Sequence, residues 1–248
     1  MDTEPPKPGQ PEQESERDRS ADPEQGRRRW SRSVRVSMAG AFVLTVVLLV
    51  STFVVQPFLI PSSSMDPTLR VGDRVMVNKL AYRFGNHPAR GDVVVFDGRG
   101  SFVEEESRGN PVTGLLRAAG AAVGLMEPAD TDFVKRVIGI GGDRVTCCDE
   151  RGRLEVNGAP VEEAYLHAGD APSAVPFDIE VPRGRLWVMG DHRSGSVDSR
   201  DYLGKPGGGT VPVDQVIGRV DWVGWPPNRW DSLGAHRLPG AVRAHGDA

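Results

Sequence analysis

The feature that most constrains this 248-residue chain is a run of thirty residues, Val36–Met65, without a single charged side chain. The twenty residues 36–55 are its most apolar part, and as a helix they would span about 30 Å, close to the hydrocarbon core of a bilayer. A soluble protein rarely buries a helix that is apolar on every face. No A-x-A site follows the stretch, as it would in a cleavable signal peptide. We therefore expect one transmembrane helix over residues 36–56.

The residues before this helix predict its orientation. Five arginines and no acidic residue lie between Arg27 and Arg35, and the positive-inside rule places such a flank in the cytoplasm. Residues 1–25 have too few apolar side chains to offset the entropy cost of ordering. We expect a disordered cytoplasmic tail over 1–35, a single pass through the cell membrane, and an extracytoplasmic domain after the helix. The lipid bilayer is therefore an expected partner.

The chain after the helix has the pattern of a β domain. Short β-branched runs alternate with turn residues, and they predict strands at 74–78, 92–96, 133–138, 144–146, 153–156, 185–189 and 215–223. We expect a mainly β fold, with one antiparallel β domain over 57–232 that contains an insertion at 98–131. A short helix is predicted at 113–126 within that insertion, and residues 233–248 form a polar tail.

Composition limits the partners and cofactors. A net charge of −4 gives no basic surface for nucleic acid, so we expect no nucleic-acid partner. Cys147 and Cys148 are adjacent and lack the spacing of zinc or redox motifs, so we expect no metal and no other cofactor. The pair could be two small apolar side chains or a vicinal disulfide. We expect a monomer.

Lysine is scarce, which narrows the search for a basic amine. Only four lysines occur, at positions 7, 79, 135 and 205. Lys135 stands in an apolar predicted strand beside Arg136, and alternation places these two cations on opposite faces, so that one of them must face inward. Burial lowers the pKa of a lysine and lets it accept a proton near neutral pH, which an arginine cannot do. Lys135 is therefore the candidate base.

Two polar segments could supply the rest of a site. Serines 62–64 lie between two prolines that restrict the backbone directly after the apolar stretch. The segment 189–200 follows an apolar strand and combines glycines with hydroxyls, carboxylates and guanidinium groups, which can hold one another in a hydrogen-bonded network. Each segment alone is also compatible with an ordinary linker or surface loop.

Four sequence boxes together resemble those of the bacterial type I signal peptidases. In chain order they are Pro61-Ser-x-Ser-Met-x-Pro-Thr-Leu69, Gly91-Asp-Val-Val-Val-Phe96, Phe133-Val-Lys-Arg-Val-x-Gly139 with Gly142-Asp143, and Gly190-Asp-x-Arg193 leading to Ser196-x-Asp-Ser-Arg200. The resemblance covers about residues 56–225. It implies a β catalytic domain of the signal-peptidase type, a membrane-bound serine endopeptidase that removes signal peptides from secretory preproteins at Ala-x-Ala sites through a Ser-Lys dyad and an acyl-enzyme.

The resemblance also implies roles for the residues of the first and third boxes. Ser64 corresponds to the nucleophile and Lys135 to its general base. The hydroxyl of Ser62 and the backbone N–H of Ser64 correspond to the donors of an oxyanion hole, which stabilise the charge that develops in the transition state. Met65 is expected beside the substrate cleft.

The fourth box supplies residues that the resemblance assigns to support. Ser196 corresponds to the serine that hydrogen-bonds and orients the lysine amine. Asp198 and Arg200 correspond to a supporting ion pair. Gly190 and Asp191 correspond to the junction of strand and loop that shapes the site.

Some residues depart from the family pattern or fall outside it. His192, Ser194 and Gly195 stand where the family more often has Asn, an acid and Asn, so the charge network of this loop is expected to be weaker or wired differently. Three tryptophans, at 222, 225 and 230, could form an interfacial belt on the lipid surface, and core packing of at least one of them is an equal alternative.

Two rival functions remain open from the sequence. The first is a soluble, self-cleaving Ser-Lys peptidase with a related β fold, which the apolar helix argues against. The second is an inactive bitopic scaffold that binds an exported partner, which the presence of both Ser64 and Lys135 argues against. A penicillin-binding protein is excluded because it needs a Ser-x-x-Lys spacing that this sequence lacks.

Overall fold

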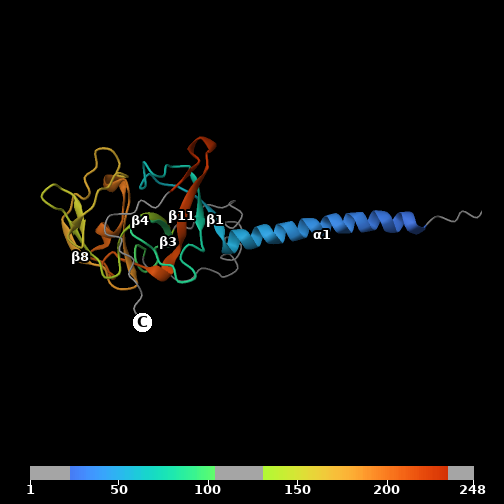
Figure 1. Ribbon diagram of the computed structural model, residues 1–248, viewed down its shortest axis with the longest axis horizontal. Helices are drawn as coiled ribbons and strands as arrows, with labels where there is room; N and C mark the ends of the chain where they lie inside the picture. Colours follow the sequence, from blue (N-terminus) through green and yellow to red (C-terminus); the bar gives the residue numbers. More distant parts are fainter. Residues whose placement is uncertain (1–22, 104–130, 234–248) are drawn as a thin grey trace, which may run out of the picture. The chain divides into compact units, whose positions relative to one another are not determined.

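The computed structural model describes residues 23–103 and 131–233 (Figure 1). The chain divides into two units at Thr45; the described residues of the first are helical, and the second is mainly antiparallel β. The expected mainly β fold with one amino-terminal apolar helix is confirmed. The helix predicted at 113–126 and nearly all of the predicted polar tail lie outside the described residues.

The long helix α1 (Pro23–Phe53) contains the apolar stretch. Within it, the 19 residues Arg32–Val50 form a span long and apolar enough to cross a membrane by length and composition. The helix begins at Pro23 rather than at Val36, so residues 23–35 of the expected disordered tail are helical. Proline is well suited to the first turn of a helix, and arginine is a good helix former, so the apolar helix can extend back through the basic segment.

The helix also ends earlier than the expected residue 56. Val54 donates the last helical hydrogen bond, to the carbonyl of Val50 at 2.8 Å, and β1 (Val55–Leu59) starts at the next residue. Pro57 disfavours helical dihedrals at the residue before it, and a proline is tolerated in a strand at the edge of a sheet, where β1 lies.

The larger sheet has eight strands in the order β1-β2-β11-β3-β4-β9-β10, with β12 paired to β11. Every pairing in it is antiparallel. β4 therefore lies between β3 and β9 in the interior of the sheet. The bounds of the strands after β1 are β2 Arg74–Asn78, β3 Val93–Asp97, β4 Asp132–Ile140, β9 Arg185–Met189, β10 Val211–Pro212, β11 Val216–Trp225 and β12 Asp231–Ser232.

A smaller antiparallel sheet has four strands in the order β7-β6-β5-β8. Its strands are β5 Arg144–Cys147, β6 Leu154–Val156, β7 Ala159–Pro160 and β8 Phe177–Glu180. Short 3₁₀ helices occupy loops of the domain, at η1 Arg193–Gly195, η2 Ser199–Tyr202, η3 Val213–Gln215 and η4 Pro227–Arg229.

All seven strands predicted from β-branched runs are present, and their ends differ from the prediction by two residues at most. The strands that the sequence pattern missed are β1, β7, β8, β10 and β12. Three of these contain a proline and three have only two residues, and β8 contains two acidic residues. Such strands carry little intrinsic signal, because tertiary pairing decides whether they form.

Apolar side chains of both sheets form three buried clusters. Trp187 is fully buried in the first of them. By contrast Trp222, Trp225 and Trp230 are 61%, 54% and 70% exposed, so the alternative of core packing for one of these three is wrong. Cys147 and Cys148 are joined in a disulfide.

Candidate active site

Ser64 lies in a tight turn between β1 and β2. The N–H of Asp66 donates to the carbonyl of Ser63 at 3.0 Å, and the N–H of Leu69 donates to the carbonyl of Met65 at 2.9 Å. Met65 and Leu69 are 1% and 0% exposed within the same apolar cluster. The buried side chains of Met65 and Leu69 and these two hydrogen bonds hold the backbone around Ser64. The two prolines that flank the serines are therefore only one of the restraints on this backbone. The expected position of Met65 beside a substrate cleft stays a prediction.

Lys135 lies on β4, near the middle of the larger sheet. Its Nζ donates a hydrogen bond to Ser64 Oγ at 2.7 Å. Only 4% of Lys135 and 8% of Ser64 are exposed. Two residues far apart in the sequence are therefore brought into direct contact in a nearly dry environment.

The surroundings of Lys135 favour its neutral form. Burial disfavours the ammonium ion and lowers the pKa of Lys135 from 10.5 to about 8, while the carboxylates of Asp198 and Asp191 oppose the shift and the guanidinium of Arg200 assists it. Desolvation is thus the main cause. An amine with this pKa can accept a proton from a serine hydroxyl near neutral pH.

Ser62 is the candidate second oxyanion donor. Its Oγ lies 3.3 Å from Ser64 Oγ, and its side chain is exposed. The hydroxyl is therefore close to the point at which a scissile carbonyl would meet the nucleophile.

The loop after β9 forms a connected network beside the dyad. Arg200 donates to both carboxylate oxygens of Asp198, at 2.8 and 2.9 Å. The same carboxylate accepts the N–H of Gly190 and the hydroxyl of Ser196, each at 2.9 Å. The ion pair of Asp198 and Arg200 that the resemblance implied is present, and it fixes the loop to the end of β9.

Ser196 has a different partner from the one implied. Its hydroxyl donates to Asp198, and over residues 23–103 and 131–233 no hydrogen bond joins it to the amine of Lys135. The carboxylate competes for the serine proton because a hydrogen bond to an ionised acceptor is stronger than one to a neutral acceptor. The role of Ser196 as the group that orients the amine stays a prediction.

Gly190 is required by close packing against the site. A Cβ built on it would lie 2.2 Å from Ser196 Oγ and 2.5 Å from the carbonyl oxygen of Ser64. Both distances are far below a normal contact, and one of the two atoms belongs to the backbone of Ser64. Only glycine allows β9 and the serine turn to approach this closely.

Arg136 was not singled out for a role, although the sequence placed it beside Lys135. The two residues lie on opposite faces of β4, and both are buried: Lys135 is 4% exposed and Arg136 is 1% exposed. It donates to the two carboxylate oxygens of Asp191 at 2.8 and 2.6 Å and to the carbonyl of Gly91 at 2.9 Å. The hydroxyl of Thr68, from the first box, also donates to the Asp191 carboxylate, at 2.5 Å. The buried pair of Arg136 and Asp191 therefore links all four boxes.

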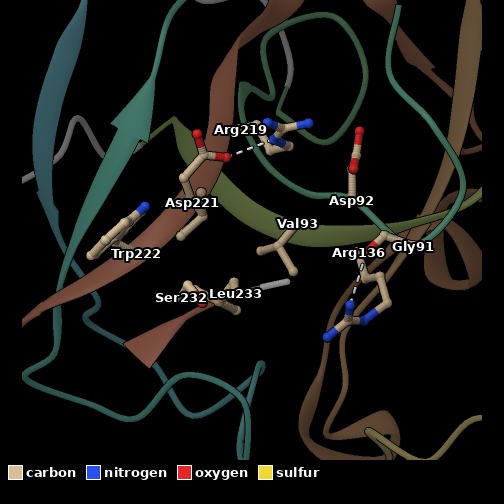
Figure 2. Close-up of a pocket in the computed structure, with 10 residues that line it drawn as sticks. Gly91, Asp92, Val93, Arg136, Arg219, Asp221, Trp222, Ser232 and Leu233 are labelled. Carbon is tan, nitrogen blue, oxygen red and sulfur yellow. Dashed lines mark hydrogen bonds and ion pairs between the residues drawn. The ribbon is translucent and has the colours of Figure 1, made fainter. Parts of the chain in front are cut away.

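The pocket in Figure 2 is separate from the dyad. It has a volume of about 280 Å³ and its lining includes Arg136, Val93 and Arg219 but neither Ser64 nor Lys135. Arg136 and Val93 are cross-strand partners, so they share the face of the sheet opposite to Lys135. This pocket is not where a substrate carbonyl would meet the serine.

Comparison with known proteins identifies the family. The model for signal peptidases of peptidase family S26 matches residues 33–225. A probable signal peptidase I of Mycobacterium leprae is 42% identical over 215 residues, which cover 74% of this chain and 73% of that protein. A signal peptidase I of Mycobacterium tuberculosis (strain H37Rv) is 41% identical over 246 residues, which cover 89% and 82%. The chain belongs to the bacterial type I signal peptidases.

Membership of the signal peptidase family confirms the resemblance carried by the four boxes, and it makes the chain a serine peptidase. The apolar helix α1 fits a membrane-anchored member of the family. A solved signal peptidase I from Enterococcus faecalis aligns with a TM-score of 0.34 and 22% identity, over 54% of this chain and 96% of that one. A TM-score this low adds nothing to the family assignment.

The loop after β9 makes further contacts with the segment between the third and fourth boxes. Ser194 donates its hydroxyl to Asp170 at 2.7 Å. Arg193, which is 4% exposed, pairs with Glu163 and donates to the carbonyl of Gly190 at 2.8 Å. The sequence motifs did not point to Glu163 or Asp170, because both lie between the third and fourth boxes.

Proposed function

We propose that this chain is a membrane-bound serine endopeptidase that removes signal peptides from exported preproteins through a Ser64–Lys135 dyad. The contact that carries the proposal is the 2.7 Å hydrogen bond between Lys135 Nζ and Ser64 Oγ, made by a buried amine whose pKa is lowered to about 8. A serine needs an adjacent base to become nucleophilic. A neutral lysine supplies that base here.

The acylation step follows from this pair. Ser64 Oγ attacks the scissile carbonyl carbon while its proton moves to Lys135 Nζ, and the substrate oxygen takes up the negative charge. The backbone N–H of Ser64 and the hydroxyl of Ser62 donate to that oxyanion. When the tetrahedral intermediate collapses, the C–N bond breaks, and the proton on Lys135 passes to the departing amine. An ester on Ser64 remains.

Deacylation repeats these roles with water. Lys135, neutral again, takes a proton from a water molecule that attacks the ester carbonyl carbon. The second tetrahedral intermediate is held by the same donors, and its collapse returns the proton to Ser64 Oγ and releases the new carboxyl end of the signal peptide.

The substrate class and the location complete the proposal. Preproteins with Ala-x-Ala ends place small side chains at the first and third residues before the cut, and we expect the apolar strands near Ser64 to form shallow pockets for them. The arginines before α1 favour a cytoplasmic amino terminus and an extracytoplasmic β domain. Exposed Trp222, Trp225 and Trp230 suit contact of the monomer with the lipid interface.

Cleavage of a model secretory precursor by the detergent-solubilised full chain tests the proposal. Ser64→Ala and Lys135→Ala should each abolish processing, because one removes the nucleophile and the other its base. The matched controls are Ser63→Ala and Lys205→Ala, whose side chains are exposed, and both should cleave at the wild-type rate. A Lys135→Ala enzyme as fast as wild type would rule out the dyad.

The same experiment separates the alternatives. Inactivity of the wild type together with both variants would favour an inactive scaffold. Time-dependent shortening of the chain itself, lost in Ser64→Ala, would favour self-cleavage. Cleavage of the precursor alone, at the end of its signal peptide, supports the proposal, and intact-mass detection of an acyl group on Ser64 would support the intermediate.

A further inference from the structure

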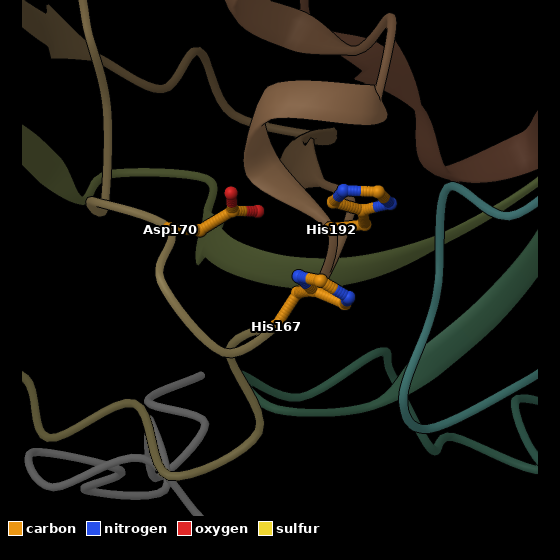
Figure 3. Close-up of side chains that lie close together, drawn as sticks. All are labelled: His167, Asp170 and His192. Atoms are coloured by element: carbon orange, nitrogen blue, oxygen red, sulfur yellow. The ribbon is translucent and has the colours of Figure 1, made fainter.

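Two histidines and an aspartate gather beside the active-site loops. The potential ligand atoms of His167, Asp170 and His192 all lie within 4.8 Å of one another. Figure 3 shows the two imidazole rings one above the other, with the Asp170 carboxylate beside them. Their ring centroids are 4.1 Å apart and their planes differ by 24°. None of the three has a role in the proposed peptide cleavage.

The loop positions that depart from the family pattern build this cluster. A Cβ on Gly195 would lie 2.8 Å from Nδ1 of His192, so the glycine makes room for the imidazole ring. Ser194 donates both its N–H and its hydroxyl to Asp170, at 3.2 and 2.7 Å. The unusual histidine, serine and glycine therefore act together, one as a ligand and two as its supports.

The donor atoms are prepared for a cation. The backbone N–H and the hydroxyl of Ser194 hold the Asp170 carboxylate beside the two rings. Nδ1 of His192 is buried and has no hydrogen-bond partner among the described residues. Nε2 of His167 lies 3.3 Å from the carboxylate of Asp66, which leaves its Nδ1 for a metal. A carboxylate behind a ligating histidine is a common device that orients the ring.

We propose that His167, Asp170 and His192 bind a zinc ion or a similar late first-row divalent ion, and that occupancy slows the peptidase. Two imidazoles and one carboxylate are a donor set that such ions prefer, with a fourth position left for water. Tetrahedral ligands at about 2.0–2.1 Å from the metal are about 3.4 Å apart. The stacked rings must therefore tilt and draw together when the ion binds.

That movement is linked to the catalytic residues through the backbone. The N–H of His192 donates to the carbonyl of Ser64 at 3.1 Å, and the N–H of His167 donates to the carbonyl of Asp191 at 3.0 Å. Tilting the rings pulls on both bonds, so it displaces the serine turn from the amine. This half of the proposal depends on the proposed peptidase function, whereas metal binding does not.

Binding is measured with the full chain in detergent, in a parent that carries His87→Ala, His236→Ala and His245→Ala. These substitutions leave the two clustered histidines as the only ones in the chain. Isothermal titration with zinc chloride should give one ion per chain, and cobalt(II) should give the visible absorption of a site with nitrogen ligands. His167→Ala or Asp170→Asn in this parent should weaken binding by about tenfold or more.

Precursor cleavage is then followed during the zinc titration. The rate of the parent should fall as the site fills and recover on chelation, whereas the His167→Ala variant should keep its rate at the same zinc concentration. Binding that is absent, or unchanged by both substitutions, would overturn the site. Stoichiometric binding without loss of rate would overturn the coupling to catalysis, and an inactive but zinc-binding chain would contradict the proposed function and leave the site standing.

Discussion

The rate of peptide cleavage should depend on pH through the amine of Lys135. Only the neutral amine can take the proton of Ser64, and burial lowers the pKa of Lys135 to about 8. Below that pH the amine is protonated and kcat/KM should fall about tenfold per pH unit. Above that pH the rate should level off. The value of kcat/KM should therefore rise with pH and then reach a plateau.

The magnitude follows from the fraction of neutral amine. At pH 7 a lysine with a pKa of about 8 is about 10% neutral, whereas one with the ordinary value is about 0.03% neutral. Burial of Lys135 thus raises the concentration of active base about 300-fold at neutral pH. Because desolvation is the largest contribution, most of this gain should depend on how dry the site is.

Arg200→Gln perturbs this balance in a known direction. The guanidinium of Arg200 lowers the pKa of Lys135 and also neutralises Asp198, whose charge raises it. Removing the cation should therefore raise the lysine pKa by about one unit. At pH 7 the rate should fall about tenfold, and the plateau should move to higher pH.

The assay is kcat/KM for a fluorogenic signal-peptide substrate between about pH 6 and pH 10. Arg144→Gln is the matched control, since Arg144 forms a similar pair with Asp178 but is 68% exposed at its side chain on the smaller sheet. Its profile should coincide with that of the wild type. A flat wild-type profile with chemistry rate-limiting, or a shift of the Arg200→Gln profile to lower pH, would refute the reasoning.

Substitutions around the dyad should separate catalysis from stability. Gly190→Ala should lower kcat/KM by about 10²-fold through displacement of the serine turn, while Gly204→Ala, which meets open space, should change nothing. Asp191→Asn leaves the buried Arg136 without its counterion and should cost about 3–5 kcal/mol in urea unfolding, and a loss below 1 kcal/mol would contradict this. Ser62→Ala should lower kcat by about 10²-fold with little change in KM; an unchanged kcat would exclude the oxyanion role.

Secondary structure could be predicted where it depends on local patterning. The β-branched runs around Lys135 and before Gly190 form strands with nearly the expected ends. The boundary between α1 and β1 was wrong because the sequence from Val50 to Leu59 is uncharged and mostly apolar, with no change in character at Val55. Hydropathy cannot tell a helix from a strand there, whereas pairing of Val55 with Asn78 in β2 decides it.

The supporting residues were harder to predict than the dyad. Arg136 and Asp191 each belong to a recognised box, but nothing in either box says that the two form a buried pair. The hydrogen bond from Ser196 to Asp198 could not be predicted either, because the competition between a carboxylate and an amine for one hydroxyl depends on distances that only the folded loop defines.

The sequence by itself determined the apolar helix and the order of the four boxes, and through the resemblance of these boxes to the signal peptidases it gave Ser64 and Lys135 as candidates. These features depend on residue type and position along the chain. Only the tertiary structure decided that the two side chains touch across 71 positions and that the amine is dry enough to be neutral near pH 8. Desolvation and proximity are properties of the surroundings in space, and residues distant in the chain create those surroundings.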